Sequence, residues 1–126
     1  MARTTKEPVA PLTPAVFHIL LALVDGERHG YGIVQEITQR TDGAVRMGPG
    51  TLYGTIKRLL ADGLIVETDD RPDPRLDDER RRYYQLTALG LRQAAAEARR
   101  LDQLVQVART KRLLPESHAL TAREGA

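Results

Sequence analysis

The chain has 126 residues, of which 41% are apolar and 29% charged, so it can bury one globular core but not two independent ones. Its formal net charge of +2 excludes the behaviour of a bulk polycation, so any nucleic-acid surface must come from local clustering of basic residues. The absence of cysteine excludes disulfides, thiolate zinc sites and thiol catalysis, and a cytoplasmic location is the default expectation.

The first predicted element is a buried helix over residues 14 to 24. Residues 1 to 11 mix Thr, Lys, Pro and Ala without periodicity, and we expect them to form a flexible arm. Thr13 followed by Pro14 has the order of a helix N-cap and first residue, and the apolar run that follows stops at Asp25-Gly26. This run is about half of the roughly 20 residues that a membrane span needs, so we expect no membrane segment.

Two amphipathic helices are expected next. The second helix opens at residues 29 to 32 and runs to about Thr41, because Ile33, Val34 and Ile37 share one face. Residues 48 to 50 read Gly-Pro-Gly and precede a third helix over residues 49 to 62. The third helix buries one side, formed by Leu52, Ile56 and Leu59, and presents the other, formed by Thr51, Gly54, Lys57, Arg58 and Ala61.

Residues 64 to 87 predict a β-hairpin with an exposed tip. Residues 64 to 68, a short segment rich in β-branched side chains, form one strand, and residues 83 to 87 are their natural partner. Residues 69 to 82 are charged and contain two prolines, which favours the tip of a hairpin over a place in the core.

A long helix is expected over residues 88 to 113, after a cap at Thr87 and before Pro115. It would be about 39 Å long and would overhang a small domain. Its apolar stripe has spacings of three and four residues and needs a partner surface. We therefore expect a dimer interface formed by Leu91, Ala94, Ala98, Leu101, Leu104, Val105 and Ala108. Residues 114 to 126 are polar and small and are expected to form a flexible tail.

This order of elements predicts a mainly α fold with a small β-hairpin: a winged helix-turn-helix over residues 12 to 87 and a C-terminal dimerisation helix. From residue 44 to 61 the chain contains Arg46, Lys57 and Arg58 but none of its 17 acidic residues. An acid-free face with the hydroxyls of Thr51 and Thr55 suits entry into a DNA groove, and Gly54 lets the backbone come close. The alternative is that Lys57 and Arg58 belong to an ordinary solvent-exposed helix face with no role in binding.

The third helix carries a family resemblance together with the segments around it. The motifs are His29-Gly30-Tyr31, residues 48 to 53 (GPGTLY), Arg58-Leu59, residues 62 to 65 (DGLI) and residues 81 to 87 (RRYYQLT). In this order and spacing, over about residues 12 to 92, they resemble the PadR family of transcriptional regulators. The resemblance implies a dimeric regulator, usually a repressor, of the short subclass with one C-terminal helix, and it places Tyr53 and its neighbours in the DNA-reading helix. It also implies a small-molecule effector for some members. Two positions depart from the family pattern: Gly54 stands where many relatives have proline, and Leu60 where they have an acid.

The candidate DNA contacts are Tyr31, Gly50, Thr51, Tyr53, Gly54, Lys57, Arg58, Arg80, Arg81 and Arg82. The hydroxyl of Tyr31 could reach a phosphate, or its ring could lie at the rim of the core. The three arginines at residues 80 to 82 either contact the DNA backbone or only balance the negative charge of the acids at residues 77 to 79.

The histidines do not indicate a metal site. His29 is expected to cap or bond locally, His18 to be a packed and hydrogen-bonded side chain, and His118 lies in the tail. No cofactor is expected.

The sequence therefore predicts a cytoplasmic, sequence-specific double-stranded DNA-binding regulator. It would act as a homodimer and repressor on an inverted repeat, with release by an effector left open. The rival is a winged-helix module that binds another protein instead of DNA. No nucleophile and base, phosphate loop or carboxylate pair is recognisable, so an enzyme is not expected.

Overall fold

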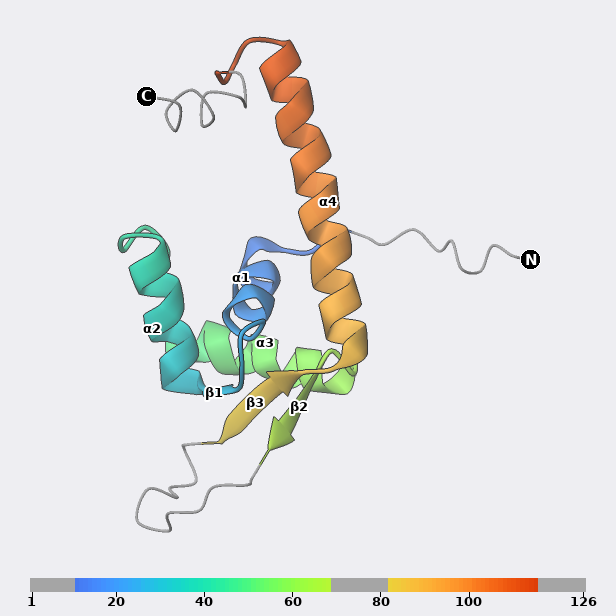
Figure 1. Cartoon of the computed structure of the whole chain (residues 1–126). Helices are drawn as coiled ribbons and strands as arrows, with labels where there is room; N and C mark the ends of the chain where they lie inside the picture. The colour runs from blue at the N-terminus through green and yellow to red at the C-terminus, as the bar shows by residue number, and fades with distance from the viewer. Residues whose placement is uncertain (1–10, 69–81, 116–126) are drawn as a thin grey trace, which may run out of the picture.

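Four helices and a three-stranded sheet build the protein, in a computed structural model that describes residues 11–68 and 82–115. In chain order they are α1 (Pro14–Ala22), β1 (Arg28–His29), α2 (Gly30–Arg40), α3 (Pro49–Ala61), β2 (Ile65–Thr68), β3 (Tyr83–Leu86) and α4 (Ala88–Thr110). Figure 1 shows α1 in the middle, with α2 on one side, α4 on the other and α3 below. The predicted mainly helical fold with a hairpin and a long last helix is confirmed.

Side chains cap three of the helices at their N-termini. The hydroxyl of Thr13 accepts a hydrogen bond from the Val16 N–H at 3.2 Å, and that of Thr87 accepts one from the Gly90 N–H at 3.0 Å. His29 Nδ1 accepts the Gly32 N–H at 3.0 Å, which confirms the expected local role of this histidine. Each cap satisfies a backbone donor that would otherwise lack a helical partner, and is worth about 1 kcal/mol.

The helices end slightly earlier than the sequence pattern indicates. α1 stops at Ala22 and not at residue 24, α3 ends at Ala61, and α4 ends at Thr110 and not at 113. At the end of α4, Arg112 has a left-handed φ of 66° and the Leu113 N–H bonds back to the Ala108 carbonyl at 2.8 Å. The chain therefore turns away before Pro115 could interrupt the helix.

The sheet has one strand that the sequence analysis missed. Its order is β1-β3-β2, with both neighbouring pairs antiparallel, Ile65 opposite Leu86 and Arg28 opposite Tyr84. β1 has only two residues, too few to show an alternating pattern, so only its pairing with β3 makes it a strand. The expected hairpin of β2 and β3 is present, while its tip, residues 69–81, lies outside the described residues, as do residues 1–10 of the arm and 116–126 of the tail.

The core lies where α1, α2 and α3 meet the sheet. Its fully buried large side chains are Ile19, Leu20, Ile33, Ile37, Leu59 and Ile65. They come from four elements, and α1 contacts all three other helices, so the domain is organised around α1. This packing fixes how α2, α3 and the hairpin stand relative to one another.

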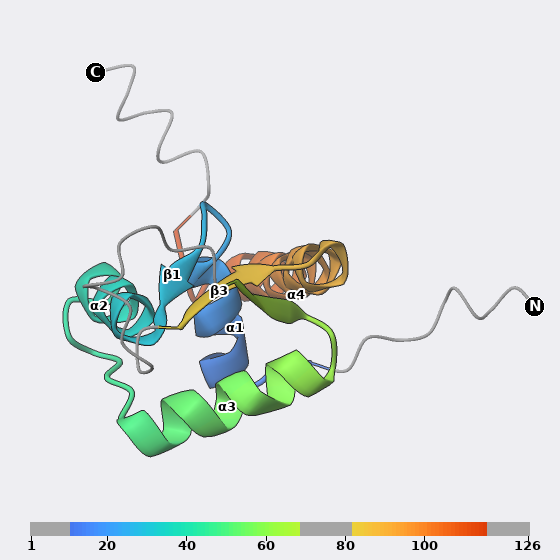
Figure 2. The same cartoon turned by 90° about the horizontal axis from the view of Figure 1, so that it is seen from below.

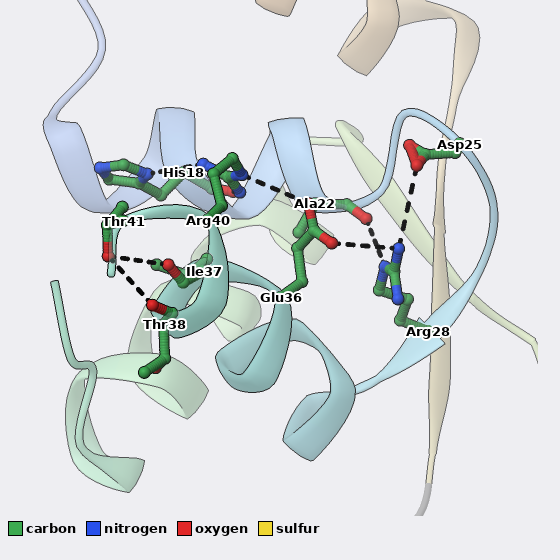
Figure 3. A network of polar contacts seen from close by, with 9 residues as sticks. All are labelled: His18, Ala22, Asp25, Arg28, Glu36, Ile37, Thr38, Arg40 and Thr41. Carbon is green, nitrogen blue, oxygen red and sulfur yellow. Dashed lines mark hydrogen bonds and ion pairs between the residues drawn. The ribbon is translucent and has the colours of Figure 1, made fainter. Parts of the chain in front are cut away.

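A polar network joins α2 to α1 at the surface (Figure 3). The Arg28 guanidinium donates to the Ala22 carbonyl at 2.7 Å and pairs with Glu36 at 3.3 Å, and Glu36 pairs with Arg40 at 3.2 Å. Arg40 in turn lies 3.1 Å from Nδ1 of His18 and donates to the His18 carbonyl at 3.3 Å. Glu36 of α2 is thus linked to α1 at two points, through Arg28 to the Ala22 carbonyl and through Arg40 to His18.

The first half of α4 packs on the rest of the domain, as expected, but it does so around a buried carboxylate. Glu97 is 3% exposed. Its carboxylate accepts hydrogen bonds from Arg100 at 3.0 and 2.6 Å and from the Leu12 N–H at 3.3 Å. The bonds from Arg100, more than the one from Leu12, hold the pKa of Glu97 below its ordinary value, against the effect of burial. The carboxylate therefore ties the segment before α1 to α4.

Glu97→Gln should lower the free energy of unfolding at pH 7 by about 1 kcal/mol, because the amide keeps a hydrogen bond for Leu12 but loses the charge that faces Arg100. In the unfolded chain the carboxyl has an ordinary pKa near 4.5. Since its pKa is lower in the folded protein, the ionised group stabilises the fold fully above that pH, and this contribution is lost as the pH falls through the folded-state pKa. Urea unfolding at pH 7 and about pH 3 should thus show a difference between variant and wild type that shrinks at the lower pH.

The matched control is Asp102→Asn, which neutralises an exposed acid on the same helix and should change stability little at either pH. A Glu97→Gln deficit that stays the same at both pH values would contradict the role assigned to the charge.

Candidate DNA-binding surface

One long face of α3 is exposed to solvent along the whole helix. In Figure 2 α3 lies at the lower edge of the molecule with no other element in front of it. The face carries six of the predicted contact residues, all exposed: Gly50, Thr51, Tyr53, Gly54, Lys57 and Arg58. The opposite face supplies Leu52, Ile56 and Leu59 to the core, so the helix cannot rotate without exposing them.

Lys57 and Arg58 differ from four arginines of the described chain that are held in ion pairs. Arg28, Arg40, Arg82 and Arg100 each have a carboxylate partner. Within residues 11–68 and 82–115, no ion pair involves Lys57 or Arg58. Since residues 44 to 61 contain no acid, these two charges are not neutralised by their own helix or by the loop before it.

The N-terminus of α3 adds to the positive character of this face. The N-cap is Gly48, which makes no side-chain hydrogen bond to the helix, and the first turn contains no acidic residue. The free N–H groups and the helix dipole therefore place partial positive charge beside Gly50 and Thr51. Such a terminus is suited to an anionic group such as a phosphate.

One hydroxyl expected on this face is not there. Thr55 is only 9% exposed and packs inward beside Ile56. The burial of Thr55 could have been predicted from the sequence, because residue 55 lies three residues after Leu52 and four before Leu59, on the same side of the helix as both. Thr51 is the exposed threonine of the helix and keeps its expected place.

Two tyrosines lie between α2 and α3. Tyr31, in the first turn of α2, is 65% exposed, so it is not a core side chain, and its ring stacks at 6.3 Å from the ring of His29. Tyr53 is 44% exposed. His29 also meets Tyr83 of β3 edge to face at 5.2 Å, which joins the start of α2 to the base of the hairpin.

Only one of the three predicted wing arginines belongs to the described chain. Arg82 is exposed just before β3 and pairs with Glu67 of β2 at 3.3 Å. Arg80 and Arg81 lie outside the described residues. The sequence analysis weighed the arginine run against acids at residues 77 to 79, but the partner of Arg82 is an acid on the neighbouring strand.

His18 is half-buried and hydrogen-bonded, as expected of a packed histidine. Burial and, after it, the charge of Arg40 lower the pKa of His18, which keeps the ring neutral at pH 7 and lets Nδ1 accept from Arg40. In the part of the chain that is described, no three His, Cys, Asp or Glu side chains come together as they would around a metal ion.

The predicted dimer stripe on α4 divides into two parts. Ala94 is 5% exposed and belongs to the core of its own domain. Leu91 and Ala98 are exposed, Leu101, Val105 and Ala108 are half-buried, and Leu104 is 54% exposed. Figure 1 shows that the second half of α4 extends beyond α1, where no described element of the chain covers it. The sequence analysis did not include the exposed Val107, Leu113 and Leu114, which continue the apolar surface of this end.

No helix in the described segments combines the length and the apolar character that crossing a membrane requires.

The sequence matches a family model described as the transcriptional regulator PadR-like family over residues 19–96. Among related proteins, the transcriptional regulator Rv3488 of Mycobacterium tuberculosis is 37% identical over 89 residues, which are 71% of this chain and 77% of that protein. Both findings confirm the resemblance drawn from the motifs, and they confirm the expectation that the chain is not an enzyme, since the family is one of transcription regulators.

Solved structures share the fold. A transcriptional regulator from Clostridium thermocellum matches with a TM-score of 0.64 and 25% identity, over 76% of this chain and 87% of its own. A PadR-like regulator from Bacillus cereus matches with a TM-score of 0.64 and 22% identity, over 80% and 92%. PadR of Bacillus subtilis, solved in complex with operator DNA, matches with a TM-score of 0.58 and 22% identity, over 68% of this chain and 47% of its own. The predicted winged helix-turn-helix fold is thereby confirmed.

Proposed function

The chain belongs to the PadR-like family of transcriptional regulators, and we propose that it binds double-stranded DNA sequence-specifically through α3, as a homodimer on an inverted-repeat operator, and represses transcription there. A small-molecule effector would release it. The observation that carries the proposal is the exposed, acid-free face of α3 with Lys57 and Arg58 outside any ion pair of the described chain. The B. subtilis relative, solved with its operator DNA, supports the same partner.

In the proposed complex α3 enters the major groove, with Gly50, Thr51, Tyr53 and Gly54 toward the base edges. Lys57, Arg58 and the hydroxyl of Tyr31 contact phosphates, which position the protein without reading sequence. Arg80, Arg81 and Arg82 contact the backbone from the hairpin. Because DNA is the partner, the site of action is the cytoplasm.

The proposed domain organisation follows from the same reading. We propose residues 12 to 87 as the DNA-binding domain and α4, which ends at Thr110 and not at the expected residue 113, as the dimerisation helix. Since Ala94 is already covered, the proposed interface consists of Leu91, Ala98, Leu101, Leu104, Val105 and Ala108. A twofold contact between two such helices would place the reading helices about 34 Å apart, one turn of DNA, which is why the operator should be an inverted repeat.

The place that we propose for the effector is an open groove on the surface. A groove of about 410 Å³ lies between the end of α1, the end of β3 and the start of α4, and Val24, Leu86 and Leu91 contribute its apolar wall. An occupant there would contact both the DNA-binding domain and the first turn of the dimerisation helix.

The test is a salt titration of duplex binding by the variant Lys57→Ala/Arg58→Ala. A dimer would lose four charges that face phosphates, so affinity should fall at least about tenfold and the slope of log K against log salt should flatten by up to about 4. Fluorescence anisotropy with a duplex of selected sequence gives both numbers. Folding should be unaffected, because both side chains are exposed.

The control variant is Arg92→Ala/Arg99→Ala. It removes the same charge from exposed positions on the side of α4 opposite the apolar stripe, and it should leave the slope near that of the wild type. The proposal fails if the α3 variant binds DNA as the wild type does. Wild-type protein that shows no salt-dependent duplex binding would favour the rival protein-binding module.

A further inference from the structure

A small apolar pocket lies beside the first turn of α3. It has a volume of about 220 Å³ and is lined by Tyr31 and Val34 of α2, Met47 of the loop, and Pro49, Leu52 and Tyr53 of α3. Leu52 and Met47 are buried and form its floor, while the exposed Tyr31 and Tyr53 stand at its rim. An apolar hollow at this place does not serve the phosphate contacts of the proposed function, which are polar.

The location of the pocket determines which chemical group can reach it. Pro49, Leu52 and Tyr53 belong to the N-terminal half of α3, next to the exposed Gly50 and Thr51. In helix-turn-helix proteins the N-terminal residues of the reading helix contact base edges in the major groove. If α3 reads DNA as proposed, the pocket faces the bases. The N-terminus of α3 beside the pocket has no side-chain cap and no acidic residue, so it does not repel the negatively charged duplex.

The chemistry of the major groove then leaves one kind of occupant. Base edges there present hydrogen-bond donors and acceptors, which an apolar lining cannot satisfy, and one apolar group, the C5-methyl of thymine. The volume is below the range of about 300 to 1,000 Å³ that drug-sized ligands fill, but it is ample for a methyl group and the edge of its ring.

We propose that this pocket receives the C5-methyl group of a thymine in each half of the operator, and that it is therefore a determinant of sequence specificity. The inference rests on the proposed DNA-binding function. Tyr31 and Tyr53 flank the methyl group, and Val34 and Leu52 contact it from α2 and α3.

Gly30 is the positioning residue of this pocket. A Cβ atom built at Gly30 would lie 2.5 Å from the hydroxyl oxygen of Tyr53 and 3.0 Å from its Cζ. Only glycine at this position lets the Tyr53 ring lie against the start of α2. In Gly30→Ala the tyrosine ring, the movable end of a side chain, must swing away, and the rim of the pocket changes while the backbone can stay.

The experiment starts from a duplex selected with the purified full chain from a random library. Each thymine is then replaced by uracil, which removes only the methyl group. One thymine in each half-site should show a three- to tenfold loss of affinity, of which the upper value corresponds to about 1.4 kcal/mol. At that position a cytosine duplex should also gain affinity when its cytosine is replaced by 5-methylcytosine, because the pocket recognises the methyl group.

Two variants connect the effect to the pocket. Val34→Thr places a hydroxyl in its wall at nearly constant volume, and Gly30→Ala moves Tyr53; both should bring the ratio of thymine to uracil affinity toward one. Val66→Thr makes the same change at an exposed valine of β2 outside the pocket and should keep the ratio of the wild type.

The outcomes separate this inference from the proposed function. Salt-dependent binding that is indifferent to uracil at every thymine overturns the pocket assignment and leaves the DNA-binding function standing. A uracil effect that Val34→Thr and Gly30→Ala both retain also overturns it, since the methyl group is then read elsewhere. Failure of the wild type to select any duplex overturns the proposed function itself.

Discussion

The variant Leu101→Asp/Val105→Asp should sediment as a monomer and bind the operator at least about 100-fold more weakly than the wild type. Both side chains are half-buried and belong to the second half of α4, close in sequence to the exposed Leu104. In the proposed dimer they meet the same stripe of a second copy, where a carboxylate would be buried without a partner. A monomer can hold only one half-site, so the gain from binding both halves together is lost.

Sedimentation velocity and anisotropy titrations measure the two effects, and circular dichroism checks that the domain remains folded. Gln103→Asp/Gln106→Asp is the matched control, because it adds the same charge to exposed positions on the opposite side of the same helical turns. The control should remain dimeric. If the Leu101/Val105 variant also remains dimeric, α4 is not the interface, and the inverted-repeat geometry built on it falls as well.

Gly90→Ala should destabilise the protein by about 3 kcal/mol, near the upper end of what one added methyl group costs in a tight interior. Gly90 is buried in the first turn of α4, and a Cβ there would collide with the backbone carbonyl oxygen of Leu64. The same junction is held by the Thr87 N–H, which donates to the Leu64 carbonyl at 3.1 Å, and by the Thr87 hydroxyl, which donates to the Gly63 carbonyl at 2.7 Å. The added methyl group would meet backbone atoms of the segment before β2, and backbone cannot move aside as the end of a flexible side chain can.

Thermal unfolding should show the melting temperature lowered by roughly 10 to 20 °C. The control is Gly54→Ala, the same change in mid-helix with no atom within 4 Å of the added Cβ, which should stabilise the fold by about 0.5 to 1 kcal/mol. Equal melting temperatures for the two variants would show that α4 is not seated this closely on the hairpin. Gly90 thus sets how near α4 stands to the start of β2.

Local sequence signals predicted the existence and the starts of the elements well. Thr13 before Pro14 and Thr87 before the last apolar stripe cap helices where the sequence places them. Gly63, with a left-handed φ of 76°, stands at the turn between α3 and β2. These signals depend on contacts within about four residues, which is the range that a sequence pattern reports directly.

The exposed basic face of α3 was also predictable from the sequence, because a helix has a fixed period. Lys57 and Arg58 fall opposite Leu52 and Leu59, and the lack of acids nearby is visible without any coordinates. The prediction that Thr55 is exposed was wrong because this period was misapplied. The helical period itself places Thr55 on the buried side of α3.

Tertiary structure alone decided the features that depend on residues far apart in the chain. β1 is a strand only because β3, more than 50 residues later, pairs with it. Glu97 is buried because Arg100 and the backbone of Leu12, 85 residues away, satisfy its carboxylate, and no pattern on α4 marks it as different from an exposed acid. The pocket beside α3 likewise needs α2 and α3 to meet at one angle. Such pairings are set by how the elements pack, whereas a helix cap or a helix face is set by neighbours along the chain.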